Sequence, residues 1–449
     1  MITFIKKVFQ KGELRQKILF TLGMLFVFRI GSAITIPAID SSKLSSGLGD
    51  TGILALMNML GGGSLERFSL FSLGVSPYIT ASIIIELLSM DVIPTLTQWK
   101  EEGEVGRKKK DKVTRYVTVV LAAIQGFSLT YAFDRSYGIL RESSMISYAY
   151  VVLVMVAGAM FAMWMGDQMT NKGIGNGISL LIFTGIISNL PSSFISAFQN
   201  LVSLDKGTQS LLLGALNYLC FILLYLLIVI FVIYNEGAVR KIKIIYTRNS
   251  NPMMRTKDTS FIPIKINSAG VIPVIFASSM LATPLTVSQL IGNSTVKEVV
   301  EKICTYNMPT KYPIGFILYL LLIILFSFFY ANMQIDVNKI NNDLASNDGM
   351  IPGYNIWKRD KVKNPDMKPS PTEIHLYKVL NRLTVVGAIF LMIIAIIPIL
   401  IPVIWESIAN SAVTLYGTGL IIVTGVALET VDQMKTYITR KEYKGRIRR

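Results

Sequence analysis

The side chains that most often perform chemistry in enzymes are scarce in this sequence. It contains one histidine, His375, and two cysteines, Cys220 and Cys304, which lie far apart. A structural zinc site needs about four such ligands, and a catalytic triad needs a histidine beside its nucleophile. The Gly-Lys-Ser/Thr loop that binds nucleotide phosphates is also missing. We therefore expect a protein that is not an enzyme, holds no metal or cofactor and takes its energy from outside.

Five ionisable side chains stand within or beside long apolar stretches and could couple ions. They are Arg29, Glu86, Glu236, Asp336 and Glu429. Secondary transporters place such groups near the middle of the membrane, whereas these five lie nearer the ends of their stretches. A solute secondary transporter is therefore the alternative to a passive channel.

The composition is typical of a membrane protein. Of the 449 residues, 52% are hydrophobic and 16% are charged, whereas soluble proteins carry about 25% charged residues. The mean hydropathy is +0.51. The net charge is +16, so basic groups outside the hydrocarbon are expected to attract membrane lipids or other anionic partners.

Ten apolar stretches are long enough to cross a bilayer as helices, at roughly 20 residues each. Most Lys and Arg residues fall in the N-terminal segment, in loops on the same side and in the tail, so the positive-inside rule puts both termini in the cytoplasm. We predict an all-α, multi-pass protein of the cell (plasma) membrane. The stretches are approximately Ile18 to Ile39, Phe68 to Leu88, Tyr116 to Phe133, Tyr148 to Gly166, Ile178 to Leu201, Leu211 to Tyr234, Ile266 to Ile291, Tyr312 to Ile335, Leu383 to Val403 and Ser407 to Leu428.

The second and seventh stretches carry the same short motif. Gly74 to Ile79 and Gly270 to Ile275 both read G-V-x-P-x-I. Each motif lies in the second stretch of a group of five, and five crossings reverse the direction of the second group. The pattern indicates an inverted repeat with its working site between the halves; a chance match is the alternative. The predicted divisions are an N-terminal half at 1–205, a C-terminal half at 206–430 with cytoplasmic loops at 235–265 and 336–380, and a basic tail at 431–449.

The segment at 50–64 is too short and too rich in glycine to cross the membrane. Ile53 to Leu60 can form about two helical turns, and the three glycines that follow permit a sharp bend. Such an apolar segment on the outer side either lies on the membrane surface or folds back into a cavity. The residues alone leave both alternatives open.

Several strings together resemble the SecY family of protein-conducting channels. They include GGGSLERFSLFSLGVSPYITASIII, NKGIGNGISLLIFTGI, INSAGVIPVIFASSM and LLIILFSFFYANMQI, in the family order along nearly the whole chain. The resemblance implies two clasped halves of five helices, a pore between them, a lateral gate between the second and seventh spans, and a plug at 50–64. The implied function is to pass unfolded secretory polypeptides across the membrane and to release membrane segments sideways.

The resemblance also assigns channel residues by position. A ring of branched aliphatic side chains excludes water and ions at rest, and it deforms around a passing polypeptide without offering fixed hydrogen-bond partners. An isoleucine in a membrane helix otherwise faces lipid or a neighbouring helix, so the ring rests on the motif alignment. The expected pore ring is Ile79, Ile83, Ile182, Ile186, Ile275 and Ile422, and the expected plug residues are Ile53, Leu54, Leu56, Met57 and Asn58.

The cytoplasmic loop after the sixth span resembles the family loop that meets the ribosome or the motor ATPase SecA. Basic residues there suit rRNA phosphates. The positive-inside rule alone explains this charge, but not the alternation of Ile242, Ile244 and Tyr246, which is typical of a β-strand. The expected contact residues are Arg240, Lys241 and Arg248. The implied partners are SecE-like and SecG-like small membrane subunits, SecA, the ribosome, signal sequences, unfolded client polypeptides and membrane lipids.

Two positions depart from the family pattern. Asn355 stands where the family usually has an arginine that couples the motor, which leaves open an accessory paralogue with a restricted set of clients. Glu86 stands at a lateral-gate position where glutamine is common, near Gln125 and Ser82. In a closed gate, Glu86 either takes up a proton or hydrogen-bonds to these neighbours; alternatively, it reaches the cytoplasmic interface and stays charged.

Overall fold

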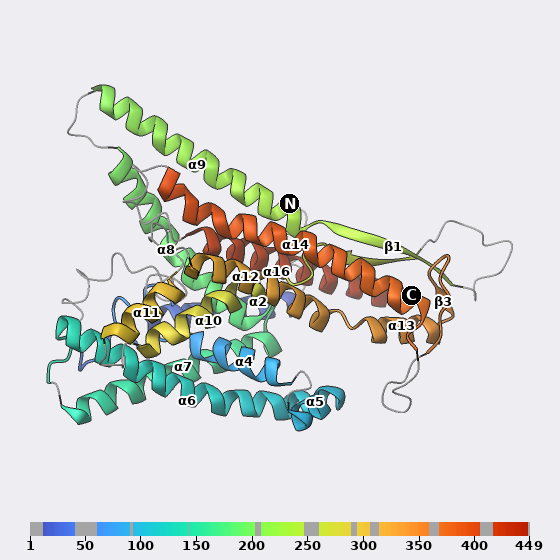
Figure 1. Ribbon diagram of the computed structural model, residues 1–449, viewed down its shortest axis with the longest axis horizontal. Helices are drawn as coiled ribbons and strands as arrows, with labels where there is room; N and C mark the ends of the chain where they lie inside the picture. The colour runs from blue at the N-terminus through green and yellow to red at the C-terminus, as the bar shows by residue number, and fades with distance from the viewer. Residues whose placement is uncertain are drawn as a thin grey trace.

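Helices dominate the architecture of the chain (Figure 1). The computed structural model describes residues 12–40, 61–89, 93–142, 144–202, 208–246, 260–288, 294–305, 314–358, 368–404 and 416–447. The elements in this part of the chain are α2 (Gly12–Ala33), α4 (Ser76–Leu88), α5 (Pro94–Glu101), α6 (Glu104–Tyr137), α7 (Met145–Lys172), α8 (Gly177–Leu201), α9 (Thr208–Glu236), β1 (Val239–Tyr246), β2 (Ser260–Lys265), α10 (Ile272–Ser288), α11 (Ser294–Cys304), α12 (Ile314–Gln334), α13 (Val337–Ser346), β3 (Gly349–Met350), α14 (Pro371–Ile404) and α16 (Tyr416–Ile447).

Each of the ten apolar stretches contains one of these helices. Within the described residues, seven helical segments are long and apolar enough to cross a membrane. They lie in α2, α6, α7, α8, α9, α12 with α13, and α14. Helices α4 and α10 are also apolar but shorter, at 13 and 17 residues.

Several helix boundaries differ from the predicted stretches. Helix α6 begins at Glu104 rather than Tyr116, and α14 begins at Pro371 rather than Leu383, because a helix continues through charged residues once it leaves the hydrocarbon. Helix α4 begins later than expected. Residues 61–75 form turns, Gly74 has a φ of 54°, and Pro77 lies in the first turn of the helix, where its missing N–H costs nothing.

A small antiparallel sheet corrects the expectation of an all-α fold. Its strand order is β2-β1-β3, and Arg240 pairs with Ile264 in its register. The alternation that predicted a strand is confirmed, since Ile242 and Ile244 are buried in β1. Ile242 belongs to a second, smaller core cluster that also contains Leu376 of α14.

The helices are arranged around a buried centre. Figure 1 shows α6 and α7 along one side, α9 and α14 along the other, and α4, α10 and α12 between them. The sheet and α5 lie toward one end of the molecule, whereas α11 lies toward the opposite end. The largest core cluster draws residues from α2, α4, α7, α8, α9, α10, α12, α14 and α16, so both predicted halves contribute to it.

Candidate functional site

The two G-V-x-P-x-I motifs adopt the same local geometry. Gly74 and Gly270 have φ angles of 54° and 61°, in the left-handed region that favours glycine. Each glycine is followed by a helix whose second residue is proline. The first main-chain bonds also correspond, because Ile79 N donates to the Val75 carbonyl at 3.0 Å and Ile275 N donates to the Val271 carbonyl at 3.4 Å.

The six isoleucines assigned to the pore ring all lie in one buried apolar cluster. They come from α4, α8, α10 and α16, and none is more than 7% exposed. All six side chains are aliphatic, so they offer water and ions no polar group to bind. Helices from both predicted halves therefore contribute branched aliphatic side chains to the buried centre of the molecule. These residues are Ile79, Ile83, Ile182, Ile186, Ile275 and Ile422.

Hydroxyl side chains join the helices of the expected gate. The Thr80 and Thr283 hydroxyls lie 3.4 Å apart between α4 and α10. The Ser128 hydroxyl of α6 donates to the Thr286 carbonyl of α10. Sequence reasoning missed these four residues, although hydroxyl groups at helical spacing within apolar stretches are a signal for interhelical hydrogen bonds.

The three predicted gate residues do not form the expected polar cluster. Gln125 is 2% exposed, and its Oε1 atom has no hydrogen-bond partner. Ser82 is half-buried. Glu86 instead accepts a 2.7 Å hydrogen bond from Lys110 Nζ of α6. The expected bond from Glu86 to Gln125 or Ser82 is therefore wrong, and the pairing with Lys110 favours the alternative in which Glu86 reaches the end of α4.

We expect the Glu86–Lys110 pair to fasten α4 to α6. Both side chains are largely buried, at 17% and 22% exposure, so Glu86→Gln and Lys110→Gln should each destabilise the protein by about 1 kcal/mol. The exchange Glu86→Lys with Lys110→Glu should recover at least half of the loss in thermal unfolding. Glu102→Gln is the matched control, because its bond to Lys109 joins two exposed side chains. A swap that is no better than the single variants would contradict this role.

An arginine of the first span holds the chain where the expected plug segment ends. Arg29 Nη1 donates to the Gly62 carbonyl at 2.7 Å and to Ser188 Oγ of α8 at 3.2 Å. Gly62 has a φ of 71°, and a Cβ atom there would lie 3.1 Å from the Cα of Gly185. The turn therefore requires glycine. The assigned plug residues Ile53, Leu54, Leu56, Met57 and Asn58 lie outside the described residues.

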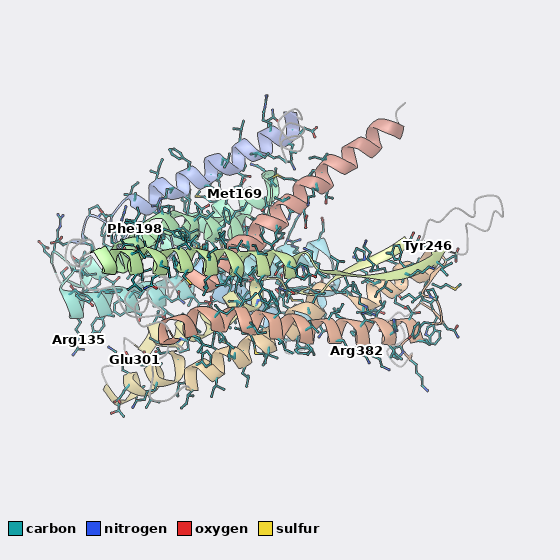
Figure 2. The ribbon with its side chains drawn as sticks, turned by 90° about the horizontal axis from the view of Figure 1, so that it is seen from above. Arg135, Met169, Phe198, Tyr246, Glu301 and Arg382 are labelled. Carbon is teal, nitrogen blue, oxygen red and sulfur yellow. The ribbon has the colours of Figure 1, made fainter. Side chains whose placement is uncertain are left out.

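The sheet presents basic side chains at one end of the molecule. Arg240 and Lys241 are exposed on β1, whereas Arg248 lies outside the described residues. Figure 2 shows Tyr246 and Arg382 toward this end and Arg135 and Glu301 toward the opposite end.

The loop that contains Asn355 packs against the start of α14. The carbonyl of Asn355 accepts hydrogen bonds from the Thr372 main-chain N–H at 3.3 Å and from the Thr372 hydroxyl at 2.9 Å. Next to it, the rings of Tyr354 and His375 stack with centroids 4.1 Å apart. Asn355, at the position where the resemblance leads us to expect an arginine, therefore lies on a structured, exposed loop beside the sheet.

Comparison with known proteins gives one consistent result. The sequence model of the SecY family matches residues 69–431. Protein translocase subunit SecY of Staphylococcus aureus (strain NCTC 8325) is 37% identical over 447 residues, with 99% of each chain covered. The corresponding subunit of Bacillus subtilis (strain 168) is 37% identical over 449 residues, again with 99% of each chain covered.

Solved structures of low sequence identity share the fold. A protein-conducting channel superposes with a TM-score of 0.62 at 17% identity, covering 94% of this chain and 92% of that one. Sec61 in a canine ribosome–channel complex from the endoplasmic reticulum gives 0.60 at 16% identity with the same coverage. A SecY structure in which the plug domain stabilises the closed channel and maintains a membrane seal also gives 0.60 at 16% identity and the same coverage.

Proposed function

Because this chain belongs to the SecY family, we infer that it is the channel-forming subunit of a protein translocase. It passes unfolded secretory polypeptides across the membrane and releases membrane segments sideways. The convergence of six buried isoleucines from four helices carries this proposal, because such a ring seals the pore by excluding water. A solute transporter would need ionisable groups at its centre, and the matched relatives are translocase subunits.

We propose that all ten helices cross the membrane, including α4, α10 and α16. The two halves, 1–205 and 206–430, form an inverted repeat, which is supported by the matching geometry at Gly74 and Gly270. We place the protein in the plasma membrane. The positive-inside rule then puts the sheet, the tail at 431–449 and both termini on the cytoplasmic side.

We propose that α4 and α10 form the lateral gate. The Thr80–Thr283 contact and the bond from Ser128 to the Thr286 carbonyl hold it shut. The buried Gln125 carbonyl oxygen opposes closure, because a polar atom without a partner costs about 1–3 kcal/mol. Water or a signal sequence that enters the gate satisfies this atom, which favours opening.

We propose that the segment at 50–64 is the plug and that Arg29 holds its end in the closed channel. A hydrogen bond from a charged donor contributes about 1.5–3 kcal/mol, so loss of the bond from Arg29 to Gly62 should loosen the plug.

Arg29→Gln and deletion of residues 53–58 should each raise the resting ion conductance of reconstituted channels modestly, because the isoleucine ring still resists water. Combining both changes should give no more conductance than the deletion alone. Ser188→Ala, which removes the longer of the two Arg29 contacts, should have a smaller effect. Conductances that simply add in the combined variant would show that Arg29 does not act through the plug.

We propose that the exposed basic strand β1 binds the ribosome or SecA. One structural relative is a Sec61 channel in a ribosome complex, and Arg240 and Lys241 are exposed basic residues on β1 of this chain. SecE-like and SecG-like subunits complete the channel, and the exposed apolar faces of α2 and α9 are available to bind lipid or such subunits.

A translocation assay tests the function. The protein, purified in mild detergent with any small subunits that accompany it, is placed in proteoliposomes with SecA and ATP. We expect a precursor with a signal sequence to become protected from protease inside the vesicles, and the same protein without its signal to stay outside. Uptake of small solutes without uptake of the precursor would favour the transporter.

A further inference from the structure

A groove on the surface of α6 and α7 has no role in the proposed channel. Its volume is about 550 Å³, and its lining is almost wholly apolar. It lies between Phe127 of α6 and the α7 segment from Met145 to Ala157. The space exists because Ala149 and Ala157 are small, while neighbouring side chains such as Leu153 project outward and are exposed.

Aromatic and charged side chains mark the outer end of this groove. Phe127, Tyr131 and Arg135 follow one another at intervals of four residues on one face of α6. The Phe127 and Tyr131 rings stack, with centroids 6.2 Å apart, and Tyr131 lies 6.5 Å from Tyr148 by the same measure. Tyrosine is enriched where membrane hydrocarbon meets the headgroups, so the groove lies in the hydrocarbon just below that boundary.

Arg135 provides a cation directly above the apolar lining. Its Nη1 donates to the Tyr131 hydroxyl at 3.4 Å, and none of the ion pairs between described residues includes it. The neighbouring carboxylate of Asp134 is already engaged by the Tyr148 hydroxyl and the Leu140 main-chain N–H. The exposed guanidinium can therefore bind a phosphate, for which its planar donors are well suited.

The volume of the groove suits an acyl chain better than a helix. A helix with its side chains is about 10–12 Å across. Over the roughly 15 Å of one bilayer leaflet, it would displace at least about twice the volume of the groove. A single acyl chain needs no polar partner, and the lining offers none, since the only hydroxyl there belongs to Tyr148.

We propose that this groove binds one phospholipid of the outer leaflet, with an acyl chain between α6 and α7 and the phosphate on Arg135. About 12 Å of helix separates Phe127 from Arg135, so the glycerol backbone lies beside Tyr131 and Tyr148. The site is separate from the isoleucines of the proposed pore ring, because its lining residues lie outside the central core cluster.

Photolabelling tests the site. The protein with its accompanying subunits is placed in phosphatidylcholine nanodiscs that contain a small fraction of phosphatidylglycerol with a diazirine in one acyl chain. We expect labelled peptides from 145–157, and at least fivefold less labelling there in Ala157→Phe or the milder Ala149→Leu. Arg135→Gln should reduce labelling about threefold. Val120→Phe, on an exposed part of α6 outside the groove, is the matched control and should change nothing.

A diazirine diacylglycerol, which lacks the phosphate, tests the phosphate contact separately from the acyl-chain contact. Its labelling of the parent protein should be no stronger than the labelling of the Arg135→Gln variant by the phospholipid. Equal labelling by both probes, or labelling that survives Ala157→Phe and Ala149→Leu in folded protein, would overturn the proposal. Labelling of 145–157 that appears only after the small subunits are removed would also overturn it, because a protein helix would then be the natural occupant.

Discussion

Replacing Ile79 or Ile275 by asparagine is expected to leave the protein in the membrane but make the resting channel leak small ions. Both side chains are buried in the central apolar cluster, at 6% and 7% exposure. An amide buried there without partners costs about 1–3 kcal/mol, and water that enters the constriction removes this cost. Conductance of planar bilayers containing the reconstituted variants should rise at least tenfold over the parent.

A matched change on the same helix controls for helix polarity. Ile84 lies on α4 but is 36% exposed, so Ile84→Asn adds the same amide away from the cluster and should not raise conductance. If Ile79→Asn and Ile275→Asn conduct no more than the parent or Ile84→Asn, these two residues do not belong to the pore ring.

The second large effect is expected at strand β1, where Arg240→Glu with Lys241→Glu should abolish binding of ribosomes or SecA without lowering expression. Both side chains are exposed on β1, so reversing their charge disturbs no core contact. Binding that depends on phosphates weakens with salt. The parent should therefore lose affinity as salt rises, and the double variant should bind more than about tenfold more weakly even at low salt.

Charge reversal at the opposite end of the molecule is the control. Lys297→Glu with Lys302→Glu changes the net charge by the same amount on α11. Among the described ion pairs, Lys297 pairs with Glu301 and Lys302 pairs with Glu298, both on the same helix. This variant should bind ribosomes or SecA like the parent. If the β1 double variant retains full affinity, Arg240 and Lys241 do not bind these partners and serve only to set the orientation of the chain in the membrane.

Apolar length and repeated motifs made much of the fold predictable. Every predicted stretch contains a helix because a bilayer requires long apolar segments whose main-chain groups are paired internally. The repeated glycine and proline indicated that the two groups of five stretches correspond, and Gly74 and Gly270 do adopt similar positive φ angles.

Contacts between distant side chains could not be predicted in the same way. The partner of Glu86 is Lys110, which precedes the third stretch and looked like an ordinary cytoplasmic lysine. Its position follows from the extension of α6 back to Glu104, whereas hydropathy places the start of that stretch at Tyr116. The bond from Arg29 to Gly62 likewise depends on the turns at 61–75. Turns have no periodic pattern from which their path could be predicted.

The strand prediction is confirmed, and the small sheet is the one departure of the described residues from the expected helical fold. Alternation of Ile242 and Ile244 indicated β1 correctly, because one face of the strand needs a core to cover. Pro263 interrupts the run that forms β2, and β3 has only two residues, so neither strand was expected.

The β1–β2 hairpin connects directly to α10, one of the two helices of the proposed gate. Strand β1 follows α9, and β2 leads through a short turn into α10. Main-chain bonds pair the strands from Val239 with Lys265 to Ile244 with Ser260. At the base, Asn267 Nδ2 donates to Glu236 Oε1 at 2.7 Å and to the Gly270 carbonyl at 3.0 Å, which ties the end of α9 to the start of α10.

Such a hairpin is a lever arm. The eight residues of β1 span about 26 Å, and a paired ladder resists bending far more than an unpaired loop does. We expect a push on the far end to act on α10 as a torque about the base of the hairpin at Asn267. The Thr80–Thr283 hydroxyl contact and the bond from Ser128 to the Thr286 carbonyl would both oppose a force that the length of the arm has multiplied.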